Sequence, residues 1–125
     1  MDKEYFDYEE AAMEESTNAL FAEICENLKY ENSKPAVINP ARVKDFIKAL
    51  GFLKKYAKSN RSKISYKMHS PFKWMGCISL IGSNIYFDFD TFSAVAKLAT
   101  VIDIYPRTNG TIQIDFMFND LTVSQ

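Results

Sequence analysis

Hydrophobic residues recur with a helical period over the first quarter of the chain, at residues 5–29. This spacing predicts an amphipathic helix whose outer side is acidic. Its apolar stripe consists of Phe6, Met13, Thr17, Leu20, Ile24 and Leu28. Glu9 and Glu10 interrupt the stripe, so residues 1–12 are a candidate for a frayed acidic arm.

A second helix is predicted from Asn39 to Asn60. Asn39 is a capping residue, and Pro40 stands at the first helical position, where proline is favoured. The predicted apolar face consists of Val43, Phe46, Ile47, Leu50, Leu53 and Ala57. A narrow second stripe, well rotated from that face, consists of Lys44, Lys48, Lys55 and Lys58.

From residue 63 onward the hydrophobic period changes to two, which predicts β-strands. The predicted strands cover residues 63–69, 75–81, 85–89, 101–105 and 111–118. Gly82-Ser83-Asn84 predicts a hairpin between the second and third of these strands. A short helix through Ala99, capped by Asp90 or Thr91, is predicted before the fourth strand.

The predicted order of elements is ααβββαββ, and the chain is short enough for one domain over residues 1–125. We therefore expect an α+β fold in which two N-terminal helices are followed by a mostly antiparallel sheet of about five strands. The short helix is inserted between strands of this sheet.

The last two strands form the clearest element, because Thr108-Asn109-Gly110 between them predicts a three-residue hairpin loop. With Gly110 in the left-handed conformation, Arg107 faces Thr111. This register places Ile104 opposite Ile114, Ile102 opposite Phe116, Tyr105 opposite Gln113 and Asp103 opposite Asp115. Both apolar faces of the hairpin agree in this register.

The formal net charge of −1 conceals a strong separation of charge along the chain. Residues 1–31 contain ten acidic residues and two lysines, which gives this segment a net charge of −8. Residues 42–73 contain ten basic residues and one acidic residue, which gives a net charge of +9. Such asymmetry is typical of proteins that bind a charged macromolecule, although the two segments can also neutralise each other within the fold.

The first functional hypothesis is a small non-catalytic regulatory or inhibitory protein that binds another protein through its acidic segment. Carboxylates spaced along such a helix can imitate the phosphates of a nucleic acid and occupy a basic groove on the partner. The candidate protein-binding residues are Tyr5, Phe6, Asp7, Tyr8, Glu14 and Glu15.

The alternative hypothesis is nucleic-acid binding through the basic segment 42–73. Cations neutralise phosphates and exposed aromatic rings stack on bases, so interleaved basic and aromatic residues suit this ligand. The candidate residues are Lys44, Lys48, Lys55, Lys58, Arg61, Lys63, Lys67 and Tyr66. Phe52 lies in the same segment, but its spacing does not decide between the core and the surface.

A third hypothesis is an enzyme or a metal-binding protein that uses aspartates of the strands. Asp88, Asp103 and Asp115 are weak candidates for a divalent-cation site, because such cations take several oxygen ligands. His69 is the only histidine, and the four glycines form no phosphate-binding loop. We therefore expect no catalytic residues and no cofactor.

Cys25 and Cys77 form no CxxC motif and are expected to be buried reduced thiols. The first residues lack the features of a signal peptide, and no apolar run approaches the ~20 residues that cross a bilayer. These observations predict a cytoplasmic protein with no membrane partner. The sequence leaves a homodimer open.

Overall fold

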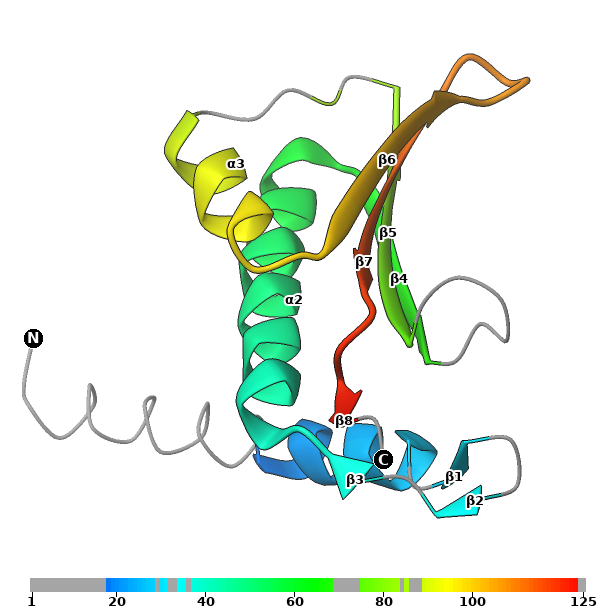
Figure 1. Cartoon of the computed structure of the whole chain (residues 1–125). Coiled ribbons are helices and arrows are strands. Elements are labelled where there is room, and N and C mark those ends of the chain that lie inside the picture. Colours follow the sequence, from blue (N-terminus) through cyan, green and yellow to red (C-terminus); the bar gives the residue numbers. More distant parts are fainter. Residues whose placement is uncertain are drawn as a thin grey trace, which may run out of the picture.

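The computed structural model describes residues 18–28, 30–31, 34–35, 37–68, 75–83, 85 and 89–123. Residues 18–28 are helical, and the other described helices are α2 (Pro40–Asn60) and α3 (Phe89–Ala96). The longer strands are β4 (Lys63–Met68), β5 (Gly76–Gly82), β6 (Val101–Pro106) and β7 (Ile112–Phe118). The short strands are β1 (Tyr30–Glu31), β2 (Lys34–Pro35), β3 (Val37–Ile38) and β8 (Thr122–Val123). The predicted α+β fold is confirmed (Figure 1).

The main sheet has the strand order β4-β5-β7-β6, and all its neighbouring strands are antiparallel. β1 pairs with β2 and β3 pairs with β8, each as a separate two-stranded sheet. The predicted register of the last hairpin is confirmed, with Ile104 opposite Ile114 and Asp103 opposite Asp115. Its loop is closed by a hydrogen bond of 2.8 Å from the Arg107 N–H to the Thr111 carbonyl. Gly110 takes the left-handed conformation at φ +81°.

The predicted hairpin between residues 75–81 and 85–89 is wrong. β5 pairs with β4 along one edge and with β7 along the other, so neither edge is open to a further strand. Ile85 lies outside any strand and Phe89 begins α3, whereas residues 86–88 lie outside the described part. Asp90 consequently stands in the first turn of α3 and does not cap it.

α2 begins and ends where the sequence predicts, and Gly51 lies inside it without interrupting it. Asn39 occupies the N-cap position, and its carbonyl accepts a hydrogen bond of 3.1 Å from the Val43 N–H. Its side chain does not cap the helix but donates from Nδ2 to the Asp120 carbonyl at 3.2 Å. The helix ends at Asn60, and the left-handed conformation of the C-cap Arg61 lets the Ser62 N–H bond to the Ala57 carbonyl at 3.1 Å.

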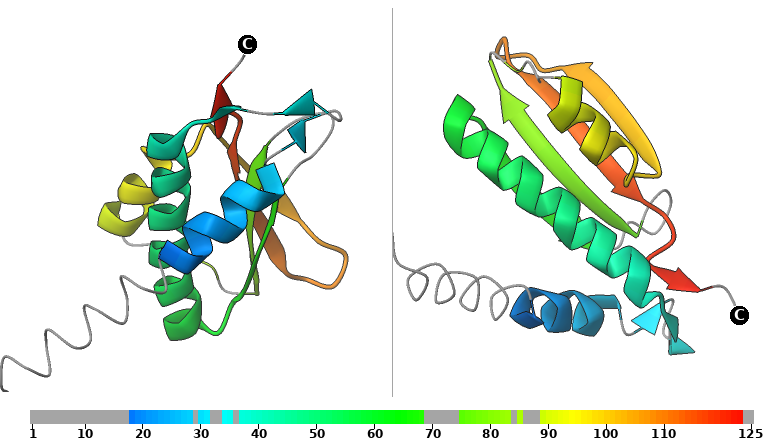
Figure 2. Two further views of the ribbon diagram at one scale, coloured as in Figure 1. Left: turned by 90° about the horizontal axis from the view of Figure 1, so that it is seen from below. Right: turned by 90° about the vertical axis from the view of Figure 1, so that its left-hand side faces the viewer.

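α2 and α3 lie on the same side of the main sheet, and the core lies between them and the sheet (Figure 2). Strand alternation points Ile78, Leu80, Ile114, Phe116 and Phe118 toward α2, and all five are buried. Phe46 of α2 meets Phe118 edge to face, with ring centroids 5.1 Å apart. Gly76 allows this approach, because a Cβ there would lie 3.0 Å from Phe46 and 2.7 Å from Leu121.

The helix at residues 18–28 lies at the end of the molecule where β3 pairs with β8 (Figure 1). Ile24 and Leu28 of its predicted apolar stripe are fully buried, and Leu20 packs at the margin of the core. The other stripe residues, Phe6, Met13 and Thr17, lie outside the described part, as does the predicted arm at residues 1–12. Among the described helices, none is both long enough and apolar enough to cross a membrane.

Arg42 joins α2 to the segments that follow α3 and β7. Its Nη1 lies 2.9 Å from Asp45 Oδ2, and its Nε lies 2.8 Å from Asp120 Oδ2. Nη2 donates to the Leu98 carbonyl at 2.6 Å, and the guanidinium carbon lies 5.3 Å from the centre of the Phe118 ring. The side chain of Arg42 is 20% exposed, so these contacts hold a partly desolvated cation between three segments.

The two phenylalanines of α2 provide a test of this packing. Phe46→Ala leaves a cavity between α2 and the sheet and should lower the free energy of unfolding by about 3–5 kcal/mol. Phe52→Ala changes a side chain that is 36% exposed and should cost under about 1 kcal/mol. Urea unfolding followed by circular dichroism measures both values. Equal losses in the two variants would contradict the described position of α2.

Candidate functional site

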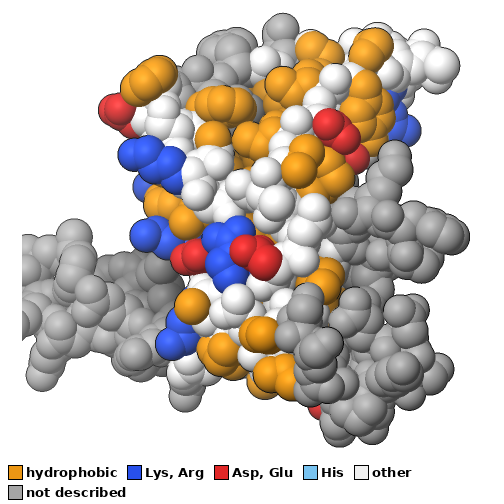
Figure 3. Space-filling view, viewed as in Figure 1, with side chains coloured by type: hydrophobic (Ala, Val, Ile, Leu, Met, Phe, Trp, Pro, Cys, Tyr) orange, Lys and Arg blue, Asp and Glu red, His pale blue; other side chains and the backbone are white. Residues whose placement is uncertain are grey.

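Four exposed lysines follow one side of α2, opposite its buried side. We call this surface the lysine face, and it consists of Lys44, Lys48, Lys55 and Lys58. At 1.5 Å per residue, its first and last members lie about 21 Å apart along the helix axis. Figure 3 shows lysine and arginine side chains along the edge of the molecule that α2 forms. The sequence-predicted stripe is therefore a solvent-facing surface.

The lysine face has no acidic partner in the part of the chain that the structure describes. Asp45, the only acidic residue of α2, pairs with Arg42, which is not part of the lysine face. Glu23 of the first helix interacts with the Tyr66 hydroxyl and with no lysine of the described residues. The candidate protein-binding residues Tyr5, Phe6, Asp7, Tyr8, Glu14 and Glu15 lie outside the described residues.

The structure separates the other nucleic-acid candidates from the lysine face. Lys63 and Lys67 alternate with the inward residues of β4, so they extend from the side of the sheet that is remote from α2. Arg61 is exposed at the end of α2. The prediction that Tyr66 is an exposed stacking platform is wrong, because it points inward and meets Phe46 edge to face at 6.1 Å.

Phe52 supplies the exposed aromatic ring that Tyr66 does not. It stands four residues after Lys48 and three before Lys55, so it borders the lysine face between them. Its side chain is 36% exposed. The helical spacing alone could not place it, because Phe52 lies at the boundary between the buried and exposed sides of α2.

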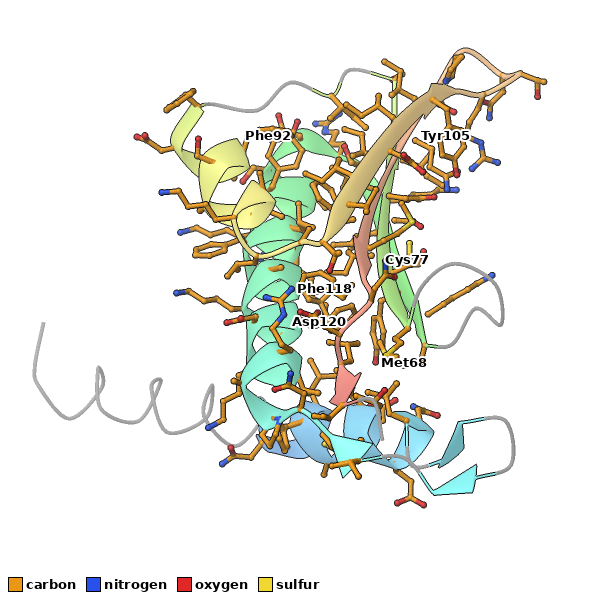
Figure 4. All side chains as sticks on the ribbon, in the orientation of Figure 1. Met68, Cys77, Phe92, Tyr105, Phe118 and Asp120 are labelled. Carbon is orange, nitrogen blue, oxygen red and sulfur yellow. The ribbon has the colours of Figure 1, made fainter. Side chains whose placement is uncertain are left out.

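The side of the main sheet remote from α2 carries a hydrogen-bonded group of polar side chains, and we call this side the polar face. The Asp115 carboxylate is its centre. Ser79 Oγ and Gln113 Nε2 donate to Asp115 Oδ1 at 2.7 and 2.9 Å, and the Tyr105 hydroxyl donates to Oδ2 at 2.8 Å. Arg107 Nη1 donates to Gln113 Oε1 at 3.2 Å and extends the group toward the hairpin loop. Figure 4 shows Tyr105 and Cys77 on this side of the sheet.

Asp103 and Asp115 face each other as predicted, but Asp115 takes its partners from neutral donors and not from a cation. The contribution of Ser79 was missed, because the sequence did not reveal that β5 lies beside β7. The hydrogen bond from Tyr105 to Asp115 could have been predicted, because the register that places Tyr105 opposite Gln113 also places it diagonally across from Asp115. Among the described residues no three His, Cys, Asp or Glu side chains group to hold a metal ion, and Asp88 lies outside them.

Tyr105 and Cys77 of the polar face are held in their neutral forms at neutral pH. Burial, followed by the hydrogen bond and the charge of Asp115, raises the pKa of Tyr105 to about 12. Burial, with the charge of Asp115 as the next cause, raises the pKa of the Cys77 thiol to about 11. Because the thiolate is the reactive form of cysteine, Cys77 is a poor nucleophile at neutral pH. The group is therefore suited to donating and accepting hydrogen bonds.

Comparisons with protein-family models, with curated proteins and with solved structures gave no match.

The pKa of Tyr105 predicts a pH-dependent contribution to stability. The folded-state pKa lies above the ordinary value of about 10, so the contribution is complete below about pH 10 and is lost as the pH rises toward 12. The wild-type protein should be more stable than Tyr105→Phe at about pH 8, and this difference should shrink between about pH 10 and 12. Urea midpoints at several pH values measure it. A difference that stays constant over this range would contradict the contact with Asp115.

Proposed function

We propose that the protein binds single-stranded nucleic acid through the lysine face of α2 and performs no catalysis. The observation that carries this proposal is the row of exposed lysines that have no acidic partner among the described residues. Cations in this state keep their charge available for phosphates, and the counterions that they displace favour binding.

Phe52 favours a single strand over a duplex as the ligand. Proteins that bind single strands combine a basic track for the backbone with aromatic rings on which the unstacked bases lie. Phe52 borders the lysine face between Lys48 and Lys55, so one ring and two cations are available within two helical turns. A folded duplex keeps its bases stacked inside and would leave this ring without a partner.

We also propose that the protein is cytoplasmic. The free thiols of Cys25 and Cys77 support it, because disulfides are rare in reducing compartments. Regulation of a partner protein through the acidic segment remains a prediction, since its candidate residues lie outside the described part of the chain. Titration with labelled oligonucleotides distinguishes it from the present proposal, because only the latter requires direct binding of nucleic acid.

A charge-matched pair of variants tests whether the lysine face is the contact surface. Lys48→Gln/Lys55→Gln should weaken binding to a dye-labelled oligothymidylate about tenfold at about 50 mM salt. It should also make the slope of log affinity against log salt shallower by about 1.4, because each lost phosphate contact removes about 0.7. Lys63→Gln/Lys67→Gln removes the same charge from the other side of the sheet and should change little. Fluorescence anisotropy measures both affinities.

Two outcomes would overturn the proposal. The first is the absence of any salt-dependent binding by the wild-type protein at about 50 mM salt. The second is an equal loss in the two charge-matched variants, which would mean that net charge rather than the lysine face determines the affinity. Both variants change exposed side chains, so circular dichroism should show unchanged folds.

The role of Phe52 is tested by Phe52→Ala, the variant that leaves the core intact. Loss of base stacking should weaken binding of the oligothymidylate about tenfold, in the range of about 1–3 kcal/mol per stacked base. The salt slope should stay at the wild-type value, because no phosphate contact is removed. Affinity equal to that of the wild type would show that Phe52 does not stack on a base, and a shallower slope would show an ionic effect instead.

A further inference from the structure

The polar face contains a hollow of about 320 Å³, which lies at the small end of the range for ligand pockets. The strand registers place Ser65, Ser79 and Asp115 next to one another across β4, β5 and β7, and these residues line it. Lys67 and Arg107 also line the hollow. The lysine face belongs to the other side of the molecule, so the hollow is independent of the proposed nucleic-acid surface.

The carboxylate and amide acceptors of the hollow are largely occupied by hydrogen bonds from the protein. A carboxylate offers about four lone-pair sites, and Asp115 uses three of them for Ser79, Gln113 and Tyr105. The Gln113 carbonyl oxygen accepts from Arg107. A ligand that brings mainly donors would therefore find few partners.

The donors of the hollow, in contrast, are largely unused. Lys67 and Ser65 have no hydrogen-bond or ion-pair partner within the described ranges. Arg107 uses one N–H for Gln113, and a guanidinium carries five. Two cations and a hydroxyl with free donors favour a ligand that is anionic and rich in acceptor oxygens.

The two cations come from opposite edges of the sheet. Lys67 belongs to β4, one edge strand, whereas Arg107 directly follows β6, the other edge strand. Arg107 leans inward, since its Nη1 reaches Gln113 on β7. Because both side chains line one hollow, they lie at its two sides with the serines between them.

We infer that this hollow binds a small organic molecule with an anionic group at each end, one group held by Lys67 and the other by Arg107. The hydroxyl of Ser65 donates to acceptor oxygens between the two ends. Asp115, which is held by neutral donors, fixes the position of Ser79 and Gln113 on the floor of the hollow. A dicarboxylate has this chemistry.

Adipate and hexanoate form a matched pair of probes, because both chains have six carbons and they differ in one terminal carboxylate. Titration of the full-length ¹⁵N-labelled protein with adipate should shift the amides of Cys77, Ser79 and Gln113 in a saturable manner. Hexanoate should bind at least about fivefold more weakly, because it lacks one of the two ion pairs.

Two single substitutions and one control complete the experiment. Lys67→Gln or Arg107→Gln should reduce the affinity for adipate to that for hexanoate. Lys63→Gln removes an outward lysine of the same strand that does not line the hollow, and it should leave the affinity for adipate unchanged. Absence of saturable shifts, equal affinity for the two probes or an equal loss in Lys63→Gln would each overturn the inference.

Discussion

The contact between α2 and one side of the main sheet, where Phe46 meets Phe118 edge to face, determines which side chains remain exposed. Strand alternation allows each strand to bury only one of its two sets of side chains on one helix layer. The buried set is aliphatic and aromatic, with Ile78, Leu80 and Phe116 fully enclosed. The other set, which includes Ser79 and Asp115, faces the opposite way and forms the polar face.

The contact between α2 and the main sheet also determines where the lysine face lies. A helix that buries one side on a sheet must present the opposite side to solvent or to another layer. Within the described part of the chain, no acidic side chain pairs with these lysines. Arg42 behaves differently, because it is 20% exposed and bound to Asp45 and Asp120. Arg42 thus stabilises the fold, whereas the four lysines of the lysine face keep their charge available for a ligand.

Local signals were sufficient to predict α2 and the last hairpin. Asn39-Pro40 and the spacing of apolar residues define the helix, and the Gly110 turn defines the register that places Asp103 opposite Asp115. The predicted hairpin after β5 was wrong, because alternation identifies a strand without identifying its neighbours. β5 obtains both its partners from elsewhere in the chain, and one of them, β7, follows it by about thirty residues.

The candidate functional residues divide in the same way, into those that local signals predict and those that depend on which strands are neighbours. The lysine face depends on helical spacing alone and was predicted, whereas the contact of Ser79 with Asp115 depends on β5 lying beside β7 and was not. Tyr66 was misplaced although the alternation of β4 was sufficient to place it, because Tyr66 shares one face of the strand with Ile64 and Met68, and that face packs against the core. Charge separation along the chain indicated a binding protein but did not locate the surface.

Binding through the lysine face requires that these lysines are uncovered in the folded protein, including the residues outside the described part. Pulsed acetylation of the native full-length protein, followed by mass spectrometry, measures this directly. If the lysine face is uncovered, Lys44, Lys48, Lys55 and Lys58 should react as fast as the exposed Lys63 and Lys67. Several-fold slower reaction of the four, relative to those two, would show that the lysine face is covered within the protein itself and is not available to a nucleic acid.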